Sequence, residues 1–292
     1  MKNWIARLGL AYCALVWGST FYLIKDSLAG VEPFALVGYR FLVSAVLLFP
    51  WVMMRKSFSR HWKESVWLSL LLTALYLSQT VGLRHTSASN SGFITGLFVL
   101  FVPLLLALKG RMPSASQWGA TALALIGLWQ LTGGTGSLNR GDLLTLVSAL
   151  TYAAHLLATD KYVRDDADPI LLAFHQFWMT GLFALILAAI AGLPLGVRSA
   201  QAGGVILFLA LIPTVSGFHI QMLAQKVTTP LTVSLIFSLE PLFAALFAWT
   251  LGREPFQPAR ALGGGLILAA MALGELSRLG PLRLRRKEIA PV

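Results

Sequence analysis

The sequence predicts an all-α integral membrane protein, in which ten transmembrane helices form two inverted five-helix repeats around a central cavity. Of its 292 residues, 57% are hydrophobic and 12% are charged, whereas a soluble domain has roughly 25% charged residues. Ten apolar segments are long enough to cross a bilayer, which takes about 20 residues each. Polar and proline positions of the first five segments recur in the last five. One soluble core cannot bury this much apolar surface, so the chain is predicted to lie in a membrane.

The ten segments leave no stretch for a soluble domain. The first one follows Lys2 and Arg7 and so looks like a signal peptide, but it lacks a small-residue cleavage site. We therefore interpret it as a retained first span. The expected segments are about residues 8–27, 33–54, 65–83, 88–108, 116–133, 141–160, 169–192, 203–224, 230–251 and 259–277.

The distribution of Lys and Arg predicts that both ends of the chain lie in the cytoplasm. In that orientation sixteen of these residues fall on the inner side and six on the outer side, and Arg40 lies within a span. Short loops rich in Lys and Arg stay preferentially on the cytoplasmic side. The net charge of +11 is then a sign of topology and of attraction to anionic lipid, and nucleic acid is not an expected partner.

Residues 1–137 and 138–292 are interpreted as two copies of one five-helix unit. Since five crossings are an odd number, the second unit enters the membrane from the opposite side. Folds of this kind place the solute site at the interface of the repeats, near the midplane. The aligned pairs, at offsets of 135 to 142 residues, include Trp17–Thr20 with Tyr152–His155, Glu32–Pro33 with Asp168–Pro169, Gln79 with Gln221, and Thr86 with Thr228.

Segment 230–251 contains the main candidate for the site. Glu240 lies in its middle, where a carboxylate costs about 2.5–3.5 kcal/mol to insert. Pro241 follows and cannot donate a hydrogen bond to the carbonyl of Phe237, so the helix is expected to bend there. We interpret Glu240 as a cavity group that binds a cationic part of a solute or cycles a proton. A structural carboxyl group, protonated or hydrogen-bonded to another span, is the alternative.

Eight further side chains are candidates for the cavity wall. Aromatic rings offer flat faces to an amphipathic solute, but small residues such as Gly18 and Ser19 equally suit close helix packing. The alignment of the two glutamines also favours a place in the cavity. The candidates are Trp17, Ser19, Phe21, Arg40, Gln79, His155, His175 and Gln221.

Arg40 and the two histidines each have competing interpretations. Arg40, about 10 Å from the outer surface, either clamps a substrate carboxylate, pairs with Glu32, or snorkels outward to lipid phosphate, which is the preferred interpretation. His155 and His175 are expected at one depth. They either form a relay with Asp160 or make separate hydrogen bonds between helices.

The chain contains the stretches VWGSTFYLIK, QTVGLRHTSASNSGFITGLFVLFVPLL and QKVTTPLTVSLIFSLEPLFAALFAW. They resemble the EamA family of the drug/metabolite transporter superfamily, and the resemblance covers nearly the whole chain in order. It implies a ten-span carrier of the bacterial inner membrane with a central cavity, usually an exporter of amino acids or other small metabolites. One departure is that span 4 has Val102–Pro103 where span 9 has Glu240–Pro241, so the carboxylate is not duplicated.

Together these features predict a secondary transporter that exports a small amphipathic metabolite by alternating access, as a monomer or homodimer. A gradient of protons or of a counter-solute would drive it. The chain has no Gly-x-Ser-x-Gly, His-Glu-x-x-His or phosphate-binding glycine loop, so no enzymatic activity, cofactor or metal site is expected. An importer or exchanger, a membrane enzyme acting on a lipid-linked substrate, and a channel are the alternatives.

Overall fold

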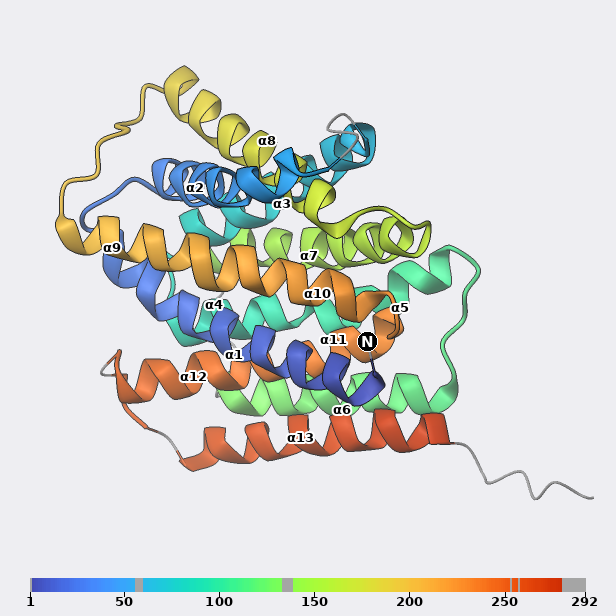
Figure 1. Ribbon diagram of the computed structural model, residues 1–292. Helices are drawn as coiled ribbons and strands as arrows, with labels where there is room; N and C mark the ends of the chain where they lie inside the picture. Colours follow the sequence, from blue (N-terminus) through green and yellow to red (C-terminus); the bar gives the residue numbers. More distant parts are fainter. Residues whose placement is uncertain (1, 56–59, 133–138, 253, 257, 280–292) are drawn as a thin grey trace, which may run out of the picture.

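The computed structural model describes residues 2–55, 60–132, 139–252, 254–256 and 258–279, and over these residues it is helical and contains no strand (Figure 1). The predicted boundary between the halves at 137/138, Lys56, Arg253 and the basic tail beyond Leu279 lie outside the described residues. The elements are α1 (Asn3–Ser27), α2 (Pro33–Met53), α3 (Trp62–Gly82), α4 (Ala88–Gly96), α5 (Phe98–Leu108), α6 (Ala115–Thr132), α7 (Arg140–Arg164), α8 (Pro169–Ile190), α9 (Ala200–Leu209), η1 (Ala210–Ser216), α10 (Gly217–Gln225), α11 (Pro230–Phe237), α12 (Leu239–Thr250) and α13 (Pro258–Leu279).

The starts of several helices follow directly from the sequence. Pro33, Pro169 and Pro230 each open a helix, where a missing N–H costs nothing because the first turn has no partner for it. Helix α7 begins with a capping box, in which the Asn139 side chain accepts from the Asp142 N–H and the Asp142 carboxylate accepts from the Asn139 N–H.

Three of the long apolar segments are irregular inside. α4 and α5 meet at Leu97, and α11 and α12 meet at Ser238. Between α9 and α10 the chain forms the π-helical turn η1, which contains Pro213. Proline removes one helical hydrogen bond, and π-helical turns are frequent at functional sites. These irregularities leave backbone carbonyls for side chains of other helices.

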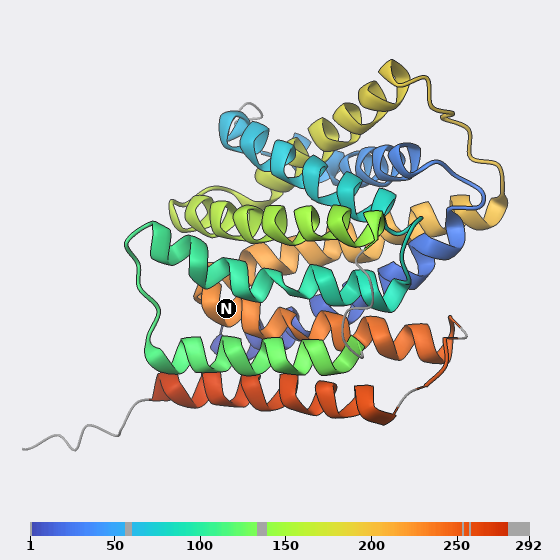
Figure 2. The ribbon, with the colours of Figure 1, turned by 180° about the vertical axis from the view of Figure 1, so that it is seen from behind.

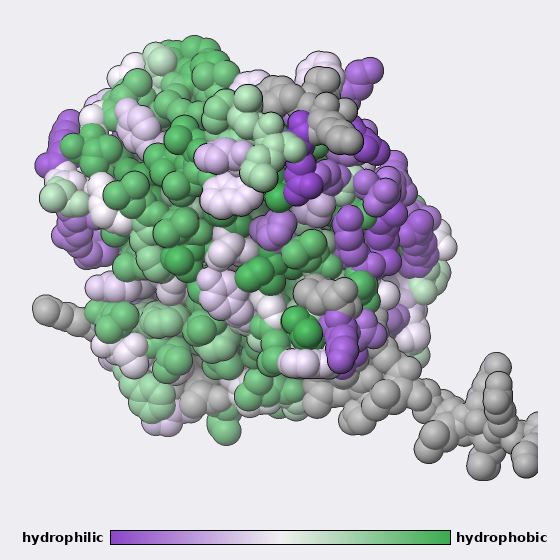
Figure 3. All heavy atoms as spheres, viewed as in Figure 1, coloured by the Kyte–Doolittle hydropathy of each residue, from purple (hydrophilic) through white to green (hydrophobic). Residues whose placement is uncertain are grey.

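Eight segments among the described residues are long and apolar enough to cross a membrane: α1, α2, α3, α4–α5, α7, α8, α9–α10 and α11–α12. Helix α2, with 21 residues, is about 31 Å long, which matches a hydrocarbon core of about 30 Å. α6 and α13 are helices outside this set, so ten spans remain a prediction. In Figure 3 apolar residues cover most of the visible face, and hydrophilic ones gather toward its two sides.

The closest helix pairs each join one predicted half of the chain to the other. α2 packs on α8, and α6 packs on α13; the latter two lie side by side along one edge in both views (Figures 1 and 2). α1 packs on α12 and α10, and α3 packs on α7. A side chain at Gly181 would meet the Gly38 carbonyl at 2.8 Å, so the α2–α8 contact needs glycine. Both halves therefore form one body.

The start of α1 and the end of α13 lie at the same end of the bundle, on the right of Figure 1, together with the α5–α6, α7–α8 and α10–α11 connections. The α1–α2 and α8–α9 connections lie at the opposite end. Between the two ends, the largest apolar core gathers aromatic rings from α1, α2, α5, α7, α8, α10 and α11. These rings are Trp17, Phe41, Phe98, Tyr152, Phe174, Phe177, Phe218 and Phe237, and Tyr76 of α3 lies among them.

Candidate functional site

The α11–α12 segment carries Glu240 just beyond its helix break. α11 ends at Phe237 and α12 begins at Leu239, and Pro241 has no N–H for the Phe237 carbonyl. The helix is interrupted close to the position where the bend was predicted, at Ser238, three residues ahead of Pro241. The Ser238 hydroxyl donates to the Leu235 carbonyl at 2.6 Å. The break places Glu240 in the first turn of α12, inside the protein.

Helix α1 reaches this turn because residue 18 is glycine. A Cβ atom there would lie 2.6 Å from the Cβ atom of Phe243 and 2.8 Å from the Glu240 carbonyl oxygen. These are backbone or rigid atoms that cannot move aside. Gly18 therefore serves helix packing, as its small size predicted, and brings the neighbouring Trp17 next to Glu240.

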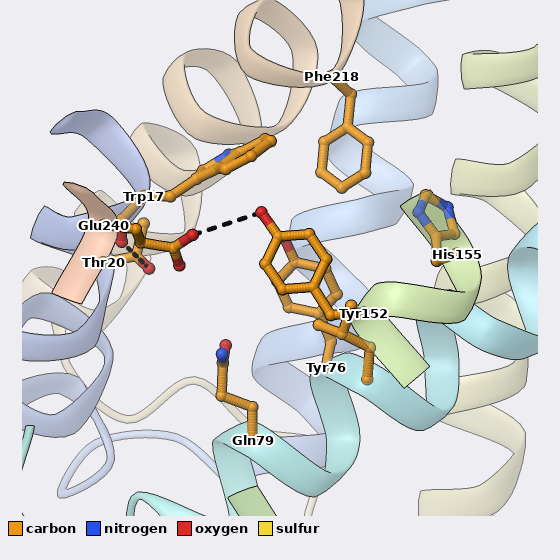
Figure 4. A pocket seen from close by; sticks show the side chains of 9 residues that line it. Trp17, Thr20, Tyr76, Gln79, Tyr152, His155, Phe218 and Glu240 are labelled. Carbon is orange, nitrogen blue, oxygen red and sulfur yellow. Dashed lines mark hydrogen bonds between the residues drawn. The ribbon is translucent and has the colours of Figure 1, made fainter. Parts of the chain in front are cut away.

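A small internal cavity lies where α1, α3, α7, α10 and α12 meet (Figure 4). Its free volume is about 20 Å³, which is room for about one water molecule. Rings and polar groups alternate around it. The lining residues are Trp17, Thr20, Leu75, Tyr76, Gln79, Tyr152, His155, Phe218 and Glu240.

The Glu240 side chain is only 4% exposed and points into the cavity toward Tyr152 (Figure 4). The Tyr152 hydroxyl donates to Glu240 Oε2 at 3.3 Å. Among the described residues this is the one side-chain hydrogen bond of Glu240, and 3.3 Å is long for an O–H···O bond. Because a buried carboxylate with so little compensation is costly, the site favours a positive partner or a proton on Glu240.

Trp17 forms the wall beside Glu240 and is fixed by the π-helical turn. Its indole Nε1 donates to the Pro213 carbonyl at 2.7 Å, and its ring meets Phe237 edge-on with the centroids 4.9 Å apart. A side chain at Gly217 would lie 2.9 Å from the indole nitrogen. The π-helical turn with Pro213 and the glycine that follows it, Gly217, together accommodate this one tryptophan.

His155 closes the cavity on another side and is held by Gln176, with 2.9 Å between His155 Nε2 and Gln176 Oε1. His175 is buried outside the lining, where its Nδ1 accepts from Trp178 Nε1 at 3.2 Å. Asp160 forms an ion pair with Arg164. In these contacts His155, His175 and Asp160 each meet a different partner, and the relay among them stays a prediction.

The structure contradicts the preferred interpretation of Arg40, in which its side chain snorkels outward to lipid phosphate. Its side chain is 1% exposed, so it does not snorkel to the surface. Glu32 is also not its partner, because Arg84 binds both Glu32 oxygens, the nearer at 2.6 Å. Instead Arg40 Nε donates to Thr214 Oγ1 at 2.7 Å, and Nη2 lies 3.4 Å from the Tyr76 hydroxyl. The guanidinium thus stands directly behind a residue of the cavity wall.

The structure brings Trp17, Gln79, His155 and Glu240 to the cavity, and Arg40 next to it. The other four candidates lie elsewhere among the described residues. Ser19 donates to its own helix at the Val16 carbonyl, and Phe21 packs in a separate apolar cluster. Gln221 donates to Gln225, and His175 is described above.

Five lining residues were not among the candidates: Thr20, Leu75, Tyr76, Tyr152 and Phe218. The predicted internal repeat points to two of these residues, Thr20 and Tyr152. At the offset of 135 residues, Trp17 aligns with Tyr152 and Thr20 with His155, and all four line the cavity. Helical spacing gives a signal for Tyr76, which lies three residues before Gln79 and so shares its face. Nothing in the sequence distinguishes Phe218 or Leu75 from other core residues.

Three comparisons with known proteins each cover most of the chain. The model of the EamA-like transporter family matches residues 4–133 and 139–274. An uncharacterized transporter of Archaeoglobus fulgidus is 31% identical over 283 residues, which cover 94% of this chain and 87% of the relative. The uncharacterized inner membrane transporter YedA of Escherichia coli K12 is 22% identical over 275 residues, covering 90% and 88%.

The uncharacterized transporter YwfM of Bacillus subtilis is 25% identical over 297 residues, covering 94% of each chain. One solved structure, titled only as the crystal structure of a protein, superposes with a TM-score of 0.77 at 18% identity and covers 94% of this chain and 99% of that one. At this identity the superposition speaks to the fold alone.

Proposed function

The chain belongs to the EamA-like transporter family, and from this premise we propose that it is a secondary transporter that exports small amphipathic metabolites, amino acids or related compounds, across the bacterial inner membrane by alternating access. Membership makes it a multi-pass membrane transporter. The direction of transport, the class of solute and the transport cycle are our proposal.

One observation carries the proposal: a buried cavity takes its lining from both predicted halves and holds a carboxyl group. Thr20 and Gln79 come from the first half, and Tyr152 and Glu240 come from the second. Inverted-repeat transporters bind their solute at such a place, near the middle of the membrane. When the two predicted halves of the chain move relative to each other, a binding site that both of them line changes its shape and its access.

We assign a separate role to each wall of this cavity. Glu240 receives the cationic group of the solute or carries a proton, and Trp17 with Phe218 packs on its apolar part. Gln79, whose amide donates to Thr95 at 3.1 Å, offers a further polar contact. Tyr76, Tyr152 and His155 are the other titratable side chains of the lining. Because they face the same cavity, a proton gained or lost by Glu240 would change the electrostatic field at each of them.

The size of the cavity supports an alternating-access cycle. With a free volume of about 20 Å³, it admits about one water and no metabolite. The state described is therefore closed, and the helices around the cavity must separate for a solute to enter. Broken helices α4–α5 and α11–α12 supply positions at which such a change takes place.

The proposal is tested by flux into and out of liposomes that contain the purified protein, with amino acids as solutes and a pH gradient as the variable. We expect saturable transport whose rate follows the gradient. Glu240→Gln removes the exchangeable proton and keeps the shape, so transport should lose its pH dependence while the melting temperature (Tm) stays near that of the parent protein.

The matched control is Glu64→Gln, since Glu64 lies in the first turn of α3, away from the cavity. It should leave both flux and pH profile intact. If Glu240→Gln folded and kept the same rate and pH profile, Glu240 would be a structural carboxyl and the coupling would be rejected.

The same liposomes distinguish the remaining candidates. An importer or exchanger would show flux that depends on which side holds the solute, and a channel would show flux that does not saturate. A membrane enzyme acting on a lipid-linked substrate would alter its substrate chemically, whereas a carrier returns the solute unchanged. We propose that both termini are cytoplasmic and that the protein works as a monomer or homodimer.

A further inference from the structure

Arg40 is a buried cation in the middle of the protein. Its side chain is 1% exposed, and its guanidinium stacks over the Tyr76 ring, 4.5 Å from the centroid. Among the ion pairs between described residues, none includes Arg40. An unbalanced charge inside a transmembrane bundle is expensive and commonly marks a functional site.

The guanidinium has a free hydrogen-bond donor as well. Nε donates to Thr214 and Nη2 faces the Tyr76 hydroxyl, but Nη1 is buried and has no partner. Because Arg presents its donors as a fork, Nη1 and Nη2 together match the two oxygens of a carboxylate. One arm of that fork is occupied only by a bond of 3.4 Å, which a better acceptor would displace.

A structural role does not account for this residue. Thr214 already donates to the Leu209 carbonyl at 2.7 Å, and Ser44, from the same helix as Arg40, donates to the Ala210 carbonyl at 3.1 Å. The Ala210 carbonyl of η1 thus has a neutral partner, and the Thr214 hydroxyl has one in addition to Arg40. A neutral side chain at position 40 would fill the space without burying a charge.

We propose that Arg40 is the anion-binding residue of the transport site and that the solute carries a carboxylate, which binds the free fork when Tyr76 moves aside. This inference rests on the proposed function and specifies its solute. Glu240 comes from α12 and Tyr76 from α3, on different sides of the cavity (Figure 4). With a carboxylate at Arg40 and an ammonium group near Glu240, the site fits a small zwitterion better than an amine or an acid alone.

The test compares matched solutes by their effect on the Tm of the purified full chain. A panel of amino acids is measured beside the amide of each, which keeps the ammonium group and loses the carboxylate, and beside sodium chloride and sodium phosphate alone. We expect at least one amino acid to bind about 30-fold or more tightly than its amide, as for the loss of one partner of a buried charge pair. Arg40→Gln should remove this difference.

Arg55→Gln is the matched control, because Arg55 is an exposed arginine paired with Asp168; it should keep the preference. Where Arg40→Gln does not fold, Arg40→Lys keeps the charge without the fork and should weaken binding of the acid much more than binding of its amide. Folded Arg40 variants with the parental preference would overturn the proposal.

Stabilisation reproduced in full by chloride or phosphate would also overturn it, since the site would then take an inorganic anion. Flux measurements in liposomes show whether the role of Arg40 alone is wrong or whether the proposed transport function is wrong as well. If amides and amines are transported as well as amino acids, Arg40 does not read a carboxylate although the protein is a transporter. If no solute of the panel moves, both fail.

Discussion

At the scale of single residues, Trp17 joins three features of the site. It lines the cavity, contacts Phe237 at the end of α11, and donates to the carbonyl of Pro213 in η1. The side chain therefore ties the helix break beside Glu240 to the π-helical turn of another span. Its replacement should affect stability and transport together.

Trp17→Phe keeps an aromatic wall but removes the indole N–H and part of the ring. We expect a loss of about 1–3 kcal/mol from the missing hydrogen bond and the space left behind, seen as a lower Tm in detergent. Trp67→Phe is the control, because Trp67 is 52% exposed. Equal Tm values for the two variants would mean that the Pro213 contact does not stabilise the fold.

The sequence indicated some site residues and missed others for a physical reason. Glu240 was identifiable because a carboxylate in an apolar segment is rare, and Trp17 because an aromatic ring within a span offers a flat face to a solute. Which way Arg40 points is decided by the neighbours it meets after folding, Thr214 and Tyr76, and these are far away in the sequence. Phe21 follows the lining residue Thr20 directly, so the helix turns its side chain toward a separate apolar cluster. Gln221 lies about one turn beyond the lining residue Phe218 and donates to Gln225.

At the scale of elements, the contact between α1 and α12 depends on Gly18. Gly18→Ala would put a Cβ atom 2.6 Å from Phe243 Cβ and 2.8 Å from the Glu240 carbonyl, so one helix must shift. Overpacking of this kind costs about 1–3 kcal/mol. We expect a lower Tm and slower flux in liposomes, because Glu240 moves with α12.

Gly204→Ala provides the control for helix propensity. Its added Cβ atom would meet nothing within 4 Å, and alanine is favoured over glycine in a helix by about 0.5–1 kcal/mol. This variant should keep its flux and be as stable as the parent or slightly more so. If Gly18→Ala behaved in the same way, the close approach of the two helices would not matter for transport.

The break between α11 and α12 gives a second prediction for an element. Pro241→Ala restores the N–H that the Phe237 carbonyl lacks, so the two short helices can join into one. We expect a higher Tm and slower transport, as stability often rises when a functional irregularity is removed. The measurement is Tm and liposome flux on the same preparation.

Pro103→Ala tests whether the position of the proline matters. Pro103 lies inside α5, and the carbonyl four residues before it belongs to Val99, beyond the break at Leu97. Its replacement should leave that break and the flux unchanged. A Pro241→Ala variant with full flux would show that the break at Ser238 is not needed for transport.

The helix starts and lengths followed closely from the sequence, because proline, capping residues and apolar length determine them. The expected segment 88–108 agrees with α4–α5, and 230–251 ends one residue beyond α12. The break at Leu97 and the π-helical turn had no such signal. Counted from the helix caps Ser87 and Thr229, Glu240 falls at the position of Phe98 and not of Val102. In either alignment the carboxylate is not duplicated, and the alignment itself stays a prediction.

At the scale of the whole molecule, corresponding contacts in the two halves support the proposed inverted repeat. Lys25, near the end of α1, donates to the carbonyl of Thr86 at 2.6 Å. Arg164, at the end of α7, donates to the carbonyl of Thr228, the residue that aligns with Thr86. α7 is the first helix of the second half as α1 is of the first. In an inverted repeat the Lys25–Thr86 and Arg164–Thr228 hydrogen bonds would lie on opposite faces of the carrier and hold each face closed.

The orientation of the bundle gives the last prediction. The α8–α9 and α5–α6 connections lie at opposite ends of the molecule (Figure 1), and the excess of Lys and Arg predicts that the α5–α6 end is cytoplasmic. Gly196→Cys introduces a thiol into the exposed α8–α9 connection, and Met112→Cys introduces one at a position 76% exposed in the α5–α6 connection. The natural Cys13 is 0% exposed, so the parent protein should give little background.

In intact cells a membrane-impermeant maleimide should therefore label Gly196→Cys, whereas Met112→Cys should react only after the membrane is permeabilised. The reverse result would place both chain ends outside, and the positive charges would then not determine the topology. Labelling of both variants in intact cells would contradict the bundle itself, since its two ends could not lie on opposite sides of a membrane. The orientation of the protein in the membrane also determines which hydrogen bond, Lys25–Thr86 or Arg164–Thr228, faces the periplasm and must break for export.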